Sequence, residues 1–295
     1  MKKFIISDIH GNGNLYYSIM SYLENVSKTD EVILYINGDL IDRGLNSAEI
    51  LLDLINRMKS NPFKIVYLAG NHELMMYEVF KKRIIGRYVS SWNDWYMNGG
   101  KVTDDGLSEI LKSKEKILEV VDFISTLPLY QKFDEKIDDK NIVLCHAMCP
   151  SHPEEICNIH LSDNSISSKY NIYSLVWTRK DESFIPFRCR IGYKDYFSIV
   201  GHTHNNNPYG YEYHSGENYL NIDGGSALYV SGYNEYDHFP LVEVNDDFLK
   251  ILTFNSNNEI IYGNYFKEGR SIPLSEEELN NERKLLNGDA KVKIN

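Results

Sequence analysis

The sequence has few cysteines and no long run of apolar residues. Its four cysteines, in 295 residues, are Cys145, Cys149, Cys157 and Cys189, and none belongs to a Cys-x-x-Cys pair. A chain of this length can bury a core without disulfide bridges, so we expect reduced thiols in a cytoplasmic protein. Cys145 and Cys149 could begin a zinc site, but no second pair completes it. Since no apolar stretch approaches the roughly 20 residues of a membrane helix, we expect neither a signal peptide nor a membrane segment.

Basic residues are also in the minority. The chain carries 31 Lys and Arg against 42 Asp and Glu, a formal net charge of −11. Proteins that bind nucleic acids or anionic membranes neutralise phosphates with Lys and Arg, so this balance argues against both partners and against a nuclease. Hydrophobic residues make up 42% of the chain, which is typical of a globular domain with an ordinary buried core.

Short apolar runs rich in β-branched and aromatic residues predict five strands. These runs are Phe4–Ile6, Val32–Ile36, Lys64–Leu68, Ile142–Cys145 and Phe197–Val200. Apolar residues at helical spacing over 15–26 and 50–58 predict helices between the first three. This alternation predicts crossover units and an α/β fold with a largely parallel central region. Later runs at 219–222, 241–244 and 248–254 predict an antiparallel portion that completes a second sheet.

Residues 78–130 depart from this alternation and predict a helical insertion beside the site. Aromatic side chains crowd its first part, and apolar residues from 107 to 124 follow helical spacing. The aromatic residues, Trp92 and Trp95 among them, either pack in the core or line a substrate groove. We expect one domain over residues 1–270. A C-terminal helix, opened by a capping box at Ser275 and Glu278, and a tail should then fill residues 271–295.

Polar side chains that can do chemistry follow all five predicted strands. They lie in the segments 8–10, 38–44, 70–73, 146–147 and 201–204. In open α/β folds, ligands collect at the carboxyl ends of the strands, so we expect these side chains at one edge. Asp8 and His10 are two residues apart and would face the same side of an extended strand. The alternative is an ordinary capped turn before Gly11.

Six of these side chains have the chemistry of a metal centre: Asp8, His10, Asp39, Asn71, His146 and His202. Three imidazoles, two carboxylates and an amide oxygen are too many ligands for one ion, but they suit two ions that share a carboxylate and a water. The absence of a thiolate from the set favours manganese, iron or zinc over a structural zinc site. Two cations roughly 3.5–4 Å apart activate a bridging water and hold both oxygens of an in-line displacement, which is phosphoester chemistry.

Two motifs give a specific resemblance to a known family. Gly-Asp-Leu-Ile-Asp-Arg-Gly at 38–44 and Gly-Asn-His-Glu at 70–73 resemble the phosphoprotein phosphatases within the calcineurin-like metallophosphoesterases. Trp-x-x-Asn-Gly-Gly at 95–100 and Trp-Thr-Arg at 177–179 resemble the bacterial branch, which includes serine/threonine protein phosphatases and symmetrical diadenosine tetraphosphatases. The resemblance implies an α/β fold, in part α+β. This is a four-layer α/β/β/α sandwich with two central mixed sheets.

The resemblance also implies a role for each residue. Asp8 and His10 would bind the first metal and Asp39 would bridge, while the second metal would be bound by Asn71, His146 and His202. A metal-bridging hydroxide would attack phosphorus directly, and His72, oriented by Asp42, would protonate the leaving oxygen. The phosphoryl oxygens would be held by Arg43, Arg179 and Asn71. His204 departs from the protein-phosphatase pattern, although the wider superfamily often has a second ligand for the first metal there.

Each assignment has a structural alternative. Asp42 and Arg43 could form an ion pair, His72 could simply begin a helix, and Arg179 could be a surface residue, while Glu73 is expected to support the fold. Three functions follow from the residues. The first is a manganese-dependent phosphatase acting on phosphoproteins or small phosphoesters. The second is a diadenosine tetraphosphate hydrolase, which the acidic balance disfavours. The third is an inactive metal-bound scaffold, which has no use for a proton donor.

Overall fold

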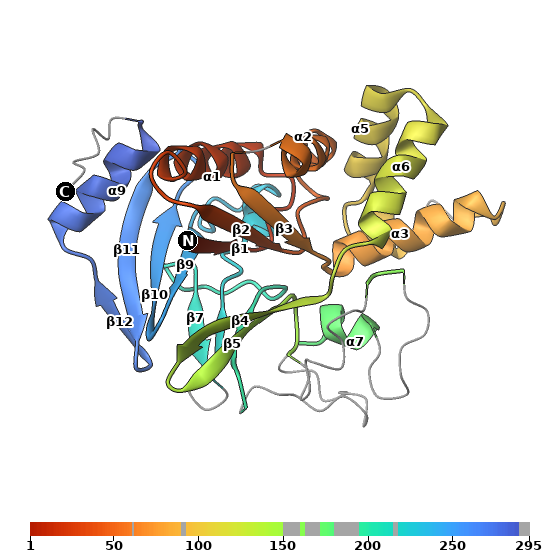
Figure 1. Cartoon of the computed structure of the whole chain (residues 1–295). Coiled ribbons are helices and arrows are strands. Elements are labelled where there is room, and N and C mark those ends of the chain that lie inside the picture. The colour runs from red at the N-terminus through yellow and green to blue at the C-terminus, as the bar shows by residue number, and fades with distance from the viewer. Residues whose placement is uncertain are drawn as a thin grey trace.

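Two stacked β-sheets form the centre of the molecule (Figure 1). The computed structural model describes residues 1–60, 62–89, 93–149, 160–162, 172–179, 195–214 and 218–288. Helices α1 (Gly13–Val26) and α2 (Ser47–Ser60) cover the outer face of the larger sheet. A core of aliphatic and aromatic side chains fills the space between the sheets, with Ile5 and Tyr35 from one and Leu144 and Phe197 from the other. The predicted α/β fold with two mixed sheets is confirmed.

The larger sheet has the strand order β12-β11-β10-β9-β1-β2-β3. Its strands are β1 (Lys2–Ile6), β2 (Val32–Asn37), β3 (Lys64–Leu68), β9 (Phe239–Asn245), β10 (Phe248–Phe254), β11 (Ile260–Lys267) and β12 (Arg270–Pro273). The first three are parallel because α1 and α2 carry the chain back between them, as crossover connections require. Strands β9 to β12 follow one another through short turns and are therefore antiparallel.

The smaller sheet has the order β4-β5-β6-β8-β7. Its strands are β4 (Tyr130–Ile137), β5 (Lys140–Cys145), β6 (Phe197–Val200), β7 (Glu212–His214) and β8 (Tyr219–Asn221). Strands β5, β6 and β8 are parallel, and β4 and β7 pair antiparallel at the two edges. Because the parallel strands of each sheet end on the same side of the sandwich, both sheets deliver loops to one site.

The prediction that residues 241–254 complete the second sheet is wrong. Strand β9 pairs antiparallel with β1, so β9 and β10 extend the first sheet. The physical reason is burial on both faces. Val242 packs in the core between the sheets, while Leu241 packs beneath the outer helices. A strand that is buried on both sides belongs inside a sheet, and the only place left beside β1 was opposite β2.

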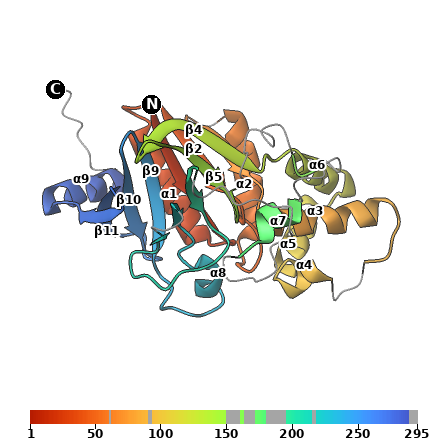
Figure 2. The same cartoon turned by 90° about the horizontal axis from the view of Figure 1, so that it is seen from below.

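The insertion consists of four helices that stand beside the sandwich (Figure 2). They are α3 (Asn71–Ile84), α4 (Asp94–Met97), α5 (Lys101–Leu111) and α6 (Lys114–Ser125). The expected start at residue 78 falls inside α3, so one continuous helix leads from the site into the insertion. Helices α7 (Ile172–Trp177), α8 (Ser226–Tyr229) and α9 (Glu276–Leu286) complete the described part, and Ser275 and Glu278 form the expected capping box of α9.

The aromatic residues at 77–96 have mixed environments. Trp95 is fully buried, with its ring centroid 5.7 Å from that of Phe80, so it packs in the core. Tyr88, by contrast, is 89% exposed and does not belong to the core. Trp92 lies outside the described residues. Among the residues that the structure describes, no helix is both long and apolar enough to cross a membrane.

Candidate metal centre

The loops that follow the strands hold their side chains in an unusual backbone conformation. Six non-glycine residues there have positive φ, namely Asp8, His10, Asp39, Asp42, Arg43 and His202. Such backbone costs of order 1–3 kcal/mol per residue and persists only where the surroundings impose it. The loops impose it on one another, since Gly11 N donates to Leu40 O at 2.8 Å and His10 N to Asp39 O at 2.9 Å.

The prediction that strand alternation aims Asp8 and His10 at one point is wrong in its geometry. Strand β1 ends at Ile6, and Asp8 and His10 have φ of 54° and 47°, so neither is extended. They lie in a turn beyond the strand that the β2 loop holds by hydrogen bonds to its backbone. The two side chains therefore reach the site through left-handed turn geometry.

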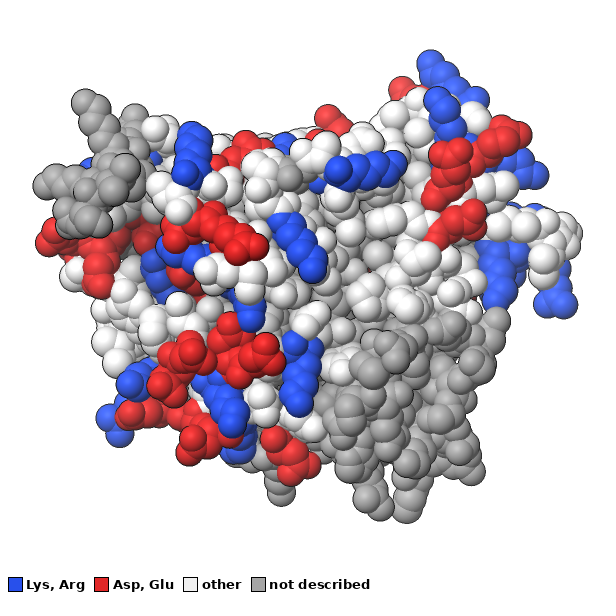
Figure 3. Space-filling view, viewed as in Figure 1, with Lys and Arg blue, Asp and Glu red and all other residues white. Residues whose placement is uncertain are grey.

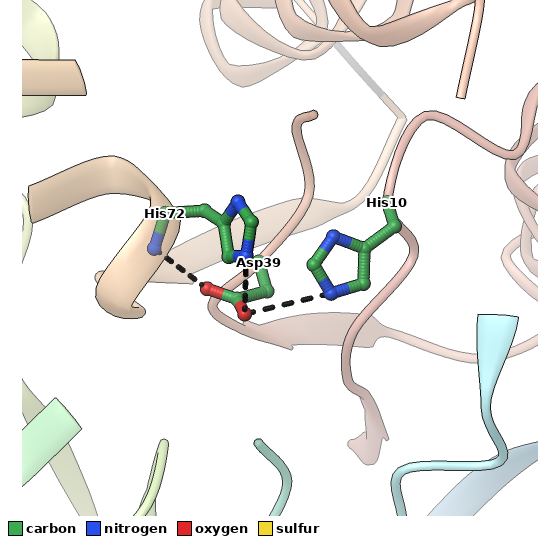
Figure 4. Close-up of side chains that lie close together, drawn as sticks. All are labelled: His10, Asp39 and His72. Atoms are coloured by element: carbon green, nitrogen blue, oxygen red, sulfur yellow. Dashed lines mark hydrogen bonds and ion pairs between the residues drawn. The ribbon is translucent and has the colours of Figure 1, made fainter. Parts of the chain in front are cut away.

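The carboxylate of Asp39 lies at the centre of the site (Figure 4). Its Oδ1 accepts a hydrogen bond from the backbone N–H of His72 at 3.0 Å. Its Oδ2 lies 3.5 Å from His10 Nε2, 3.4 Å from His146 Nε2 and 3.9 Å from His72 Nε2. Two groups with the spacing of a metal site, His10–Asp39–His72 and Asp39–His146–His202, consequently share this one carboxylate.

Backbone carbonyls fix which nitrogen of three histidines faces the site. His10 Nδ1 donates to Ile41 O at 3.1 Å, His146 Nδ1 to Asn37 O at 2.8 Å, and His202 Nε2 to Trp177 O at 3.0 Å. A neutral imidazole that donates from one nitrogen offers a lone pair on the other. Each of these rings therefore presents a lone pair to the centre, the arrangement in which protein ligands orient a metal-binding histidine.

Acceptor atoms crowd together on the side of Asn71. Its Oδ1 lies 3.0 Å from His146 Nε2 and 2.9 Å from His202 Nδ1. When both imidazoles are neutral, these three atoms all point lone pairs at one place, which is repulsive unless a cation or proton lies between them. Imidazole nitrogens and amide and carboxylate oxygens without a thiolate suit divalent manganese, iron or zinc, so the residues fit a divalent metal.

His72 has a different partner from the other histidines. Its Nδ1 lies 2.7 Å from Asp42 Oδ2, so a carboxylate rather than a carbonyl orients this ring. Burial lowers the pKa of His72, but the charges of Asp39 and Asp42 outweigh it and raise the pKa above its ordinary value. His10, whose ring is 4.6 Å away, has a pKa lowered by burial and by His72. The two neighbouring rings thus differ, one favouring a proton and the other a lone pair.

Comparisons with known proteins agree with this chemistry. A family model of calcineurin-like phosphoesterases matches residues 1–232, most of the chain. The chain belongs to the calcineurin-like phosphoesterase family. It is therefore a hydrolase, and the family together with the His and Asp clusters makes it a metal-dependent phosphoesterase that uses divalent metal ions.

Solved structures share the fold at low sequence identity. A protein serine/threonine phosphatase from Saccharomyces cerevisiae matches with a TM-score of 0.56 and 17% identity, over 86% of this chain and 80% of that one. A mutant cold-active protein tyrosine phosphatase gives a TM-score of 0.46 and 15% identity, over 86% and 78%. A proposed diadenosine tetraphosphatase gives 0.41 and 16% identity, over 93% and 94%. No curated protein matches the chain.

Asp8 of this phosphoesterase lies beside the shared carboxylate but outside the two three-residue groups. Its carboxylate accepts the backbone N–H of His202 at 3.0 and 3.1 Å and the hydroxyl of Ser7. Burial and the nearby Asp223 raise its pKa well above the usual range, which a bound cation would reverse. A Cβ at Gly201 would collide with this carboxylate, so the glycine allows the β6 loop to approach it.

The two arginines lie at different depths. Arg43 Nε is buried and has no hydrogen-bond partner within the described residues, and the Arg43 charge lowers the pKa of both His10 and His72. Arg179 is exposed, and its charge contributes to the lowered pKa of His202. Both guanidinium groups thus lie near the centre, and Arg43 carries an N–H without an acceptor.

His204 lies outside both groups of ligands. Its side chain is exposed, and its ring packs edge-on against Tyr236 with centroids 5.6 Å apart. It is nevertheless close enough to Asp223 to lower the pKa of that buried carboxyl, although burial raises the pKa overall. In the described structure His204 therefore lies next to Asp223, on the side of the site where Asp223 neighbours Asp8.

Charges within the centre depend strongly on one another. Burial raises the pKa of Asp39, but His146 and His72 outweigh it and hold the pKa well below its usual range. Burial lowers the pKa of His146, yet Asp39 raises it to about 10. Burial and the neighbouring His146 lower the pKa of His202 to about 3. In the metal-free protein, a proton on His146 therefore balances part of the charge that a cation would balance.

Sequence reasoning missed two residues that serve the His72–Asp42 pair. Trp95 Nε1 donates to Asp42 Oδ2 at 2.7 Å, and Thr103 Oγ1 donates to Asp42 Oδ1. Both come from the helical insertion, which therefore supports the site directly. The Trp-x-x-Asn-Gly-Gly motif marked Trp95 as unusual, whereas Thr103 carries no sequence signal that distinguishes it from other helical threonines.

Glu73 joins the loops that follow β2 and β3. It is fully buried and accepts hydrogen bonds from Asp39 N, Leu40 N and Gly70 N and from the hydroxyl of Tyr67. Burial and the charge of Asp39 raise its pKa, while the donated hydrogen bonds oppose that rise. The expected supporting role of Glu73 has a specific geometry: the carboxylate holds the backbone that carries Asp39.

Proposed function

We propose that this phosphoesterase is a dinuclear phosphatase that hydrolyses phosphomonoesters, in particular phosphoserine and phosphothreonine in proteins. The observation that carries the proposal is the Asp39 Oδ2 atom, which faces histidine nitrogens of both ligand groups. A carboxylate shared in this way is suited to bridge two cations. Manganese is the ion we favour, because imidazole with carboxylate and amide oxygens suits it.

The ligands would divide into two sets that share Asp39, with Asp8 and His10 on one side and Asn71, His146 and His202 on the other. Two divalent cations bound there would supply an activated water and would neutralise charge on the phosphoryl oxygens. The chain's own contribution is to fix the lone pairs toward the centre, through the backbone carbonyls that hold His10, His146 and His202.

His72 would give the leaving alkoxide its proton. With Nδ1 hydrogen-bonded to Asp42, the ring presents Nε2 toward the centre, 3.9 Å from Asp39 Oδ2. Its raised pKa keeps the ring protonated near neutral pH, which a general acid requires. Asp42 orients the ring and stabilises its charge, and Trp95 and Thr103 hold Asp42 in place.

Arg43 would bind the phosphoryl oxygens, since its buried Nε–H lacks an acceptor that a phosphate oxygen would provide. Arg179, exposed beside His202, would add a second guanidinium as substrate arrives, and Asn71 would add its amide N–H. Guanidinium groups match phosphate because two parallel N–H groups meet two oxygens.

The test is hydrolysis by purified protein with manganese of three substrates: p-nitrophenyl phosphate, a phosphoserine peptide and diadenosine tetraphosphate. We expect turnover of the first two, abolished by a chelator and restored by added metal. Preference for diadenosine tetraphosphate would replace the proposal with a dinucleotide hydrolase. Metal-loaded protein that hydrolyses none of the three would instead indicate a binding scaffold.

A further inference from the structure

A cavity of about 590 Å³ lies between α3, α4 and α7 and has no role in the chemistry described so far. Its wall includes Glu78, Lys82, Asp94, Trp95, Tyr173 and Trp177. Figure 2 shows α7 beside α3 and the insertion, so the cavity lies where the insertion meets the second sheet's loops. Its volume falls in the range of roughly 300–1,000 Å³ that is typical of ligand pockets.

Two tryptophans form a wall that the cavity shares with the reaction centre. Trp95 lines the cavity and donates from Nε1 to Asp42, the partner of the proposed acid. Trp177 lines the cavity too, while its carbonyl accepts from His202 Nε2 and its ring lies 5.9 Å from the His202 ring. One side-chain thickness therefore separates the cavity from the catalytic groups, so a chain attached to the reacting phosphate passes beside it.

The charged groups of the cavity favour a cationic ligand. Glu78 accepts a hydrogen bond from the hydroxyl of Tyr173. Burial, Glu78 and Asp94 all raise the pKa of Tyr173, so both carboxylates lie close to that hydroxyl. In the described part of the chain neither carboxylate forms an ion pair, although Lys82 lines the same wall. Carboxylates beside an aromatic face suit a guanidinium or ammonium group, through charged hydrogen bonds and cation–π contact.

We infer that this cavity binds a basic side chain, arginine or lysine, that flanks the phosphorylated residue of a protein substrate. The inference rests on the proposed function, which it makes more specific. A polyphosphate chain would meet two carboxylates and a single ammonium group, so the charge balance favours the peptide. Substrate phosphate would lie at the metal centre while the neighbouring basic side chain enters between α3 and α7.

The experiment compares phosphoserine peptides that carry arginine before or after the phosphoresidue with matched peptides that carry alanine or glutamate there. We expect a lower KM for at least one arginine peptide. Glu78→Gln combined with Asp94→Asn should remove that advantage by about tenfold, the loss expected for one charged hydrogen bond. The same variant should keep its activity on the alanine peptides and on p-nitrophenyl phosphate, which also shows that it is folded. Glu109→Gln, an exposed carboxylate of α5, is the matched control.

Three results would overturn the inference. Equal KM values for arginine and alanine peptides would show that the cavity does not read the flanking residue. A preference for glutamate peptides that Lys82→Met abolishes would assign the cavity to an anionic group. An arginine preference that survives the double variant would place the selectivity elsewhere. Hydrolysis of diadenosine tetraphosphate with no turnover of any peptide would overturn the proposed function instead, so the two failures are distinguishable.

Discussion

At the scale of single residues, the site separates two kinds of histidine by what each ring's second nitrogen contacts. His10, His146 and His202 donate to backbone carbonyls, and His72 pairs with the carboxylate of Asp42. A carbonyl fixes the tautomer without adding charge, whereas a carboxylate also stabilises the protonated ring. This difference is the physical basis for assigning three rings to metal binding and one to proton transfer.

Substitution of His72 and of Asp39 should have opposite consequences for metal and turnover. We expect His72→Asn to lower kcat by about 10²–10⁴, the usual contribution of a general acid, with metal content unchanged. Asp39→Asn should lose metal, because the shared oxygen would become neutral. Metal analysis of dialysed protein beside steady-state kinetics measures both. Loss of metal from the His72 variant would reassign that ring as a ligand.

Metal affinity should rise with pH. Asp39 raises the pKa of His146 to about 10, so the metal-free protein holds a proton there at neutral pH. A cation must displace that proton, and below the pKa its apparent affinity should increase about tenfold per pH unit for each proton released. Calorimetric titration with manganese in buffers of different ionisation enthalpy would count the protons. Binding without proton release at pH 7 would contradict the assignment.

At the scale of elements, the loops after β2 and β3 act as one unit because Glu73 accepts backbone donors from both. Asp39 N and Gly70 N share Oε2, and a Cβ at Gly70 would collide with the Asp39 carboxylate. The first turn of α3 and the Asp39 loop are therefore held in mutual contact. Asp39 owes its position to this pairing of elements more than to its own loop.

Glu73→Gln should destabilise the protein. In either orientation the amide nitrogen of glutamine would face two of the donors that Glu73 now accepts, leaving them unpaired at about 1–3 kcal/mol each. Urea denaturation should show a lower free energy of unfolding, and manganese should bind more weakly because the Asp39 backbone loses its support. The exposed Glu109→Gln serves as control and should unfold like the parent. Unchanged stability of the Glu73 variant would contradict the described network.

Helix α4 contributes to catalysis through Trp95. Trp95→Phe keeps the ring packed against Phe80 but removes the N–H that Asp42 accepts. We expect lower kcat with unchanged metal content, and a loss of about 1.5–3 kcal/mol of stability, typical of a hydrogen bond to a charged group. Tyr96→Phe is the control, since Tyr96 contacts Asp104 and Arg83 rather than Asp42. A Trp95 variant with full kcat would show that Asp42 needs no donor from the insertion.

At the scale of the whole molecule, charge and metal binding are connected. The chain has a net charge of −11, and on the face shown in Figure 3 the described basic side chains are interspersed with acidic ones. The site buries Asp8, Asp39, Asp42 and Glu73 within a few residues of one another in space. Two divalent cations would offset these buried charges, so the folded state should depend on metal.

Chelation should lower thermal stability reversibly. A ligand that binds only the folded state stabilises it by about 2.7 kcal/mol at a hundred times its dissociation constant. We expect the melting temperature to fall by several degrees with a chelator and to recover with excess manganese, in parallel with activity. Differential scanning calorimetry measures the shift. His160→Ala, a variant at an exposed histidine of the described structure, should retain the full metal-dependent shift.

The sequence by itself determined the local events: which segments form strands and helices, and which polar residues follow each strand. Strand and helix spacing depends on neighbours in the chain, so Val32–Asn37 and Gly13–Val26 were predictable to within a few residues. The site residues were found because Asp, His and Asn follow strands whose ends share one edge. Their chemical types were sufficient to predict a metal-dependent phosphoesterase.

Only the tertiary structure decided how these pieces meet. Strands β9 and β10 joined the first sheet because burial on both faces depends on which neighbours are available, and no local pattern records that. Asp8 and His10 reach the centre through left-handed turns that the β2 loop imposes. Trp95 and Thr103 meet Asp42 across 53 and 61 residues, because the insertion folds back onto the site. Contacts between distant segments depend on packing of the whole chain, which spacing alone does not contain.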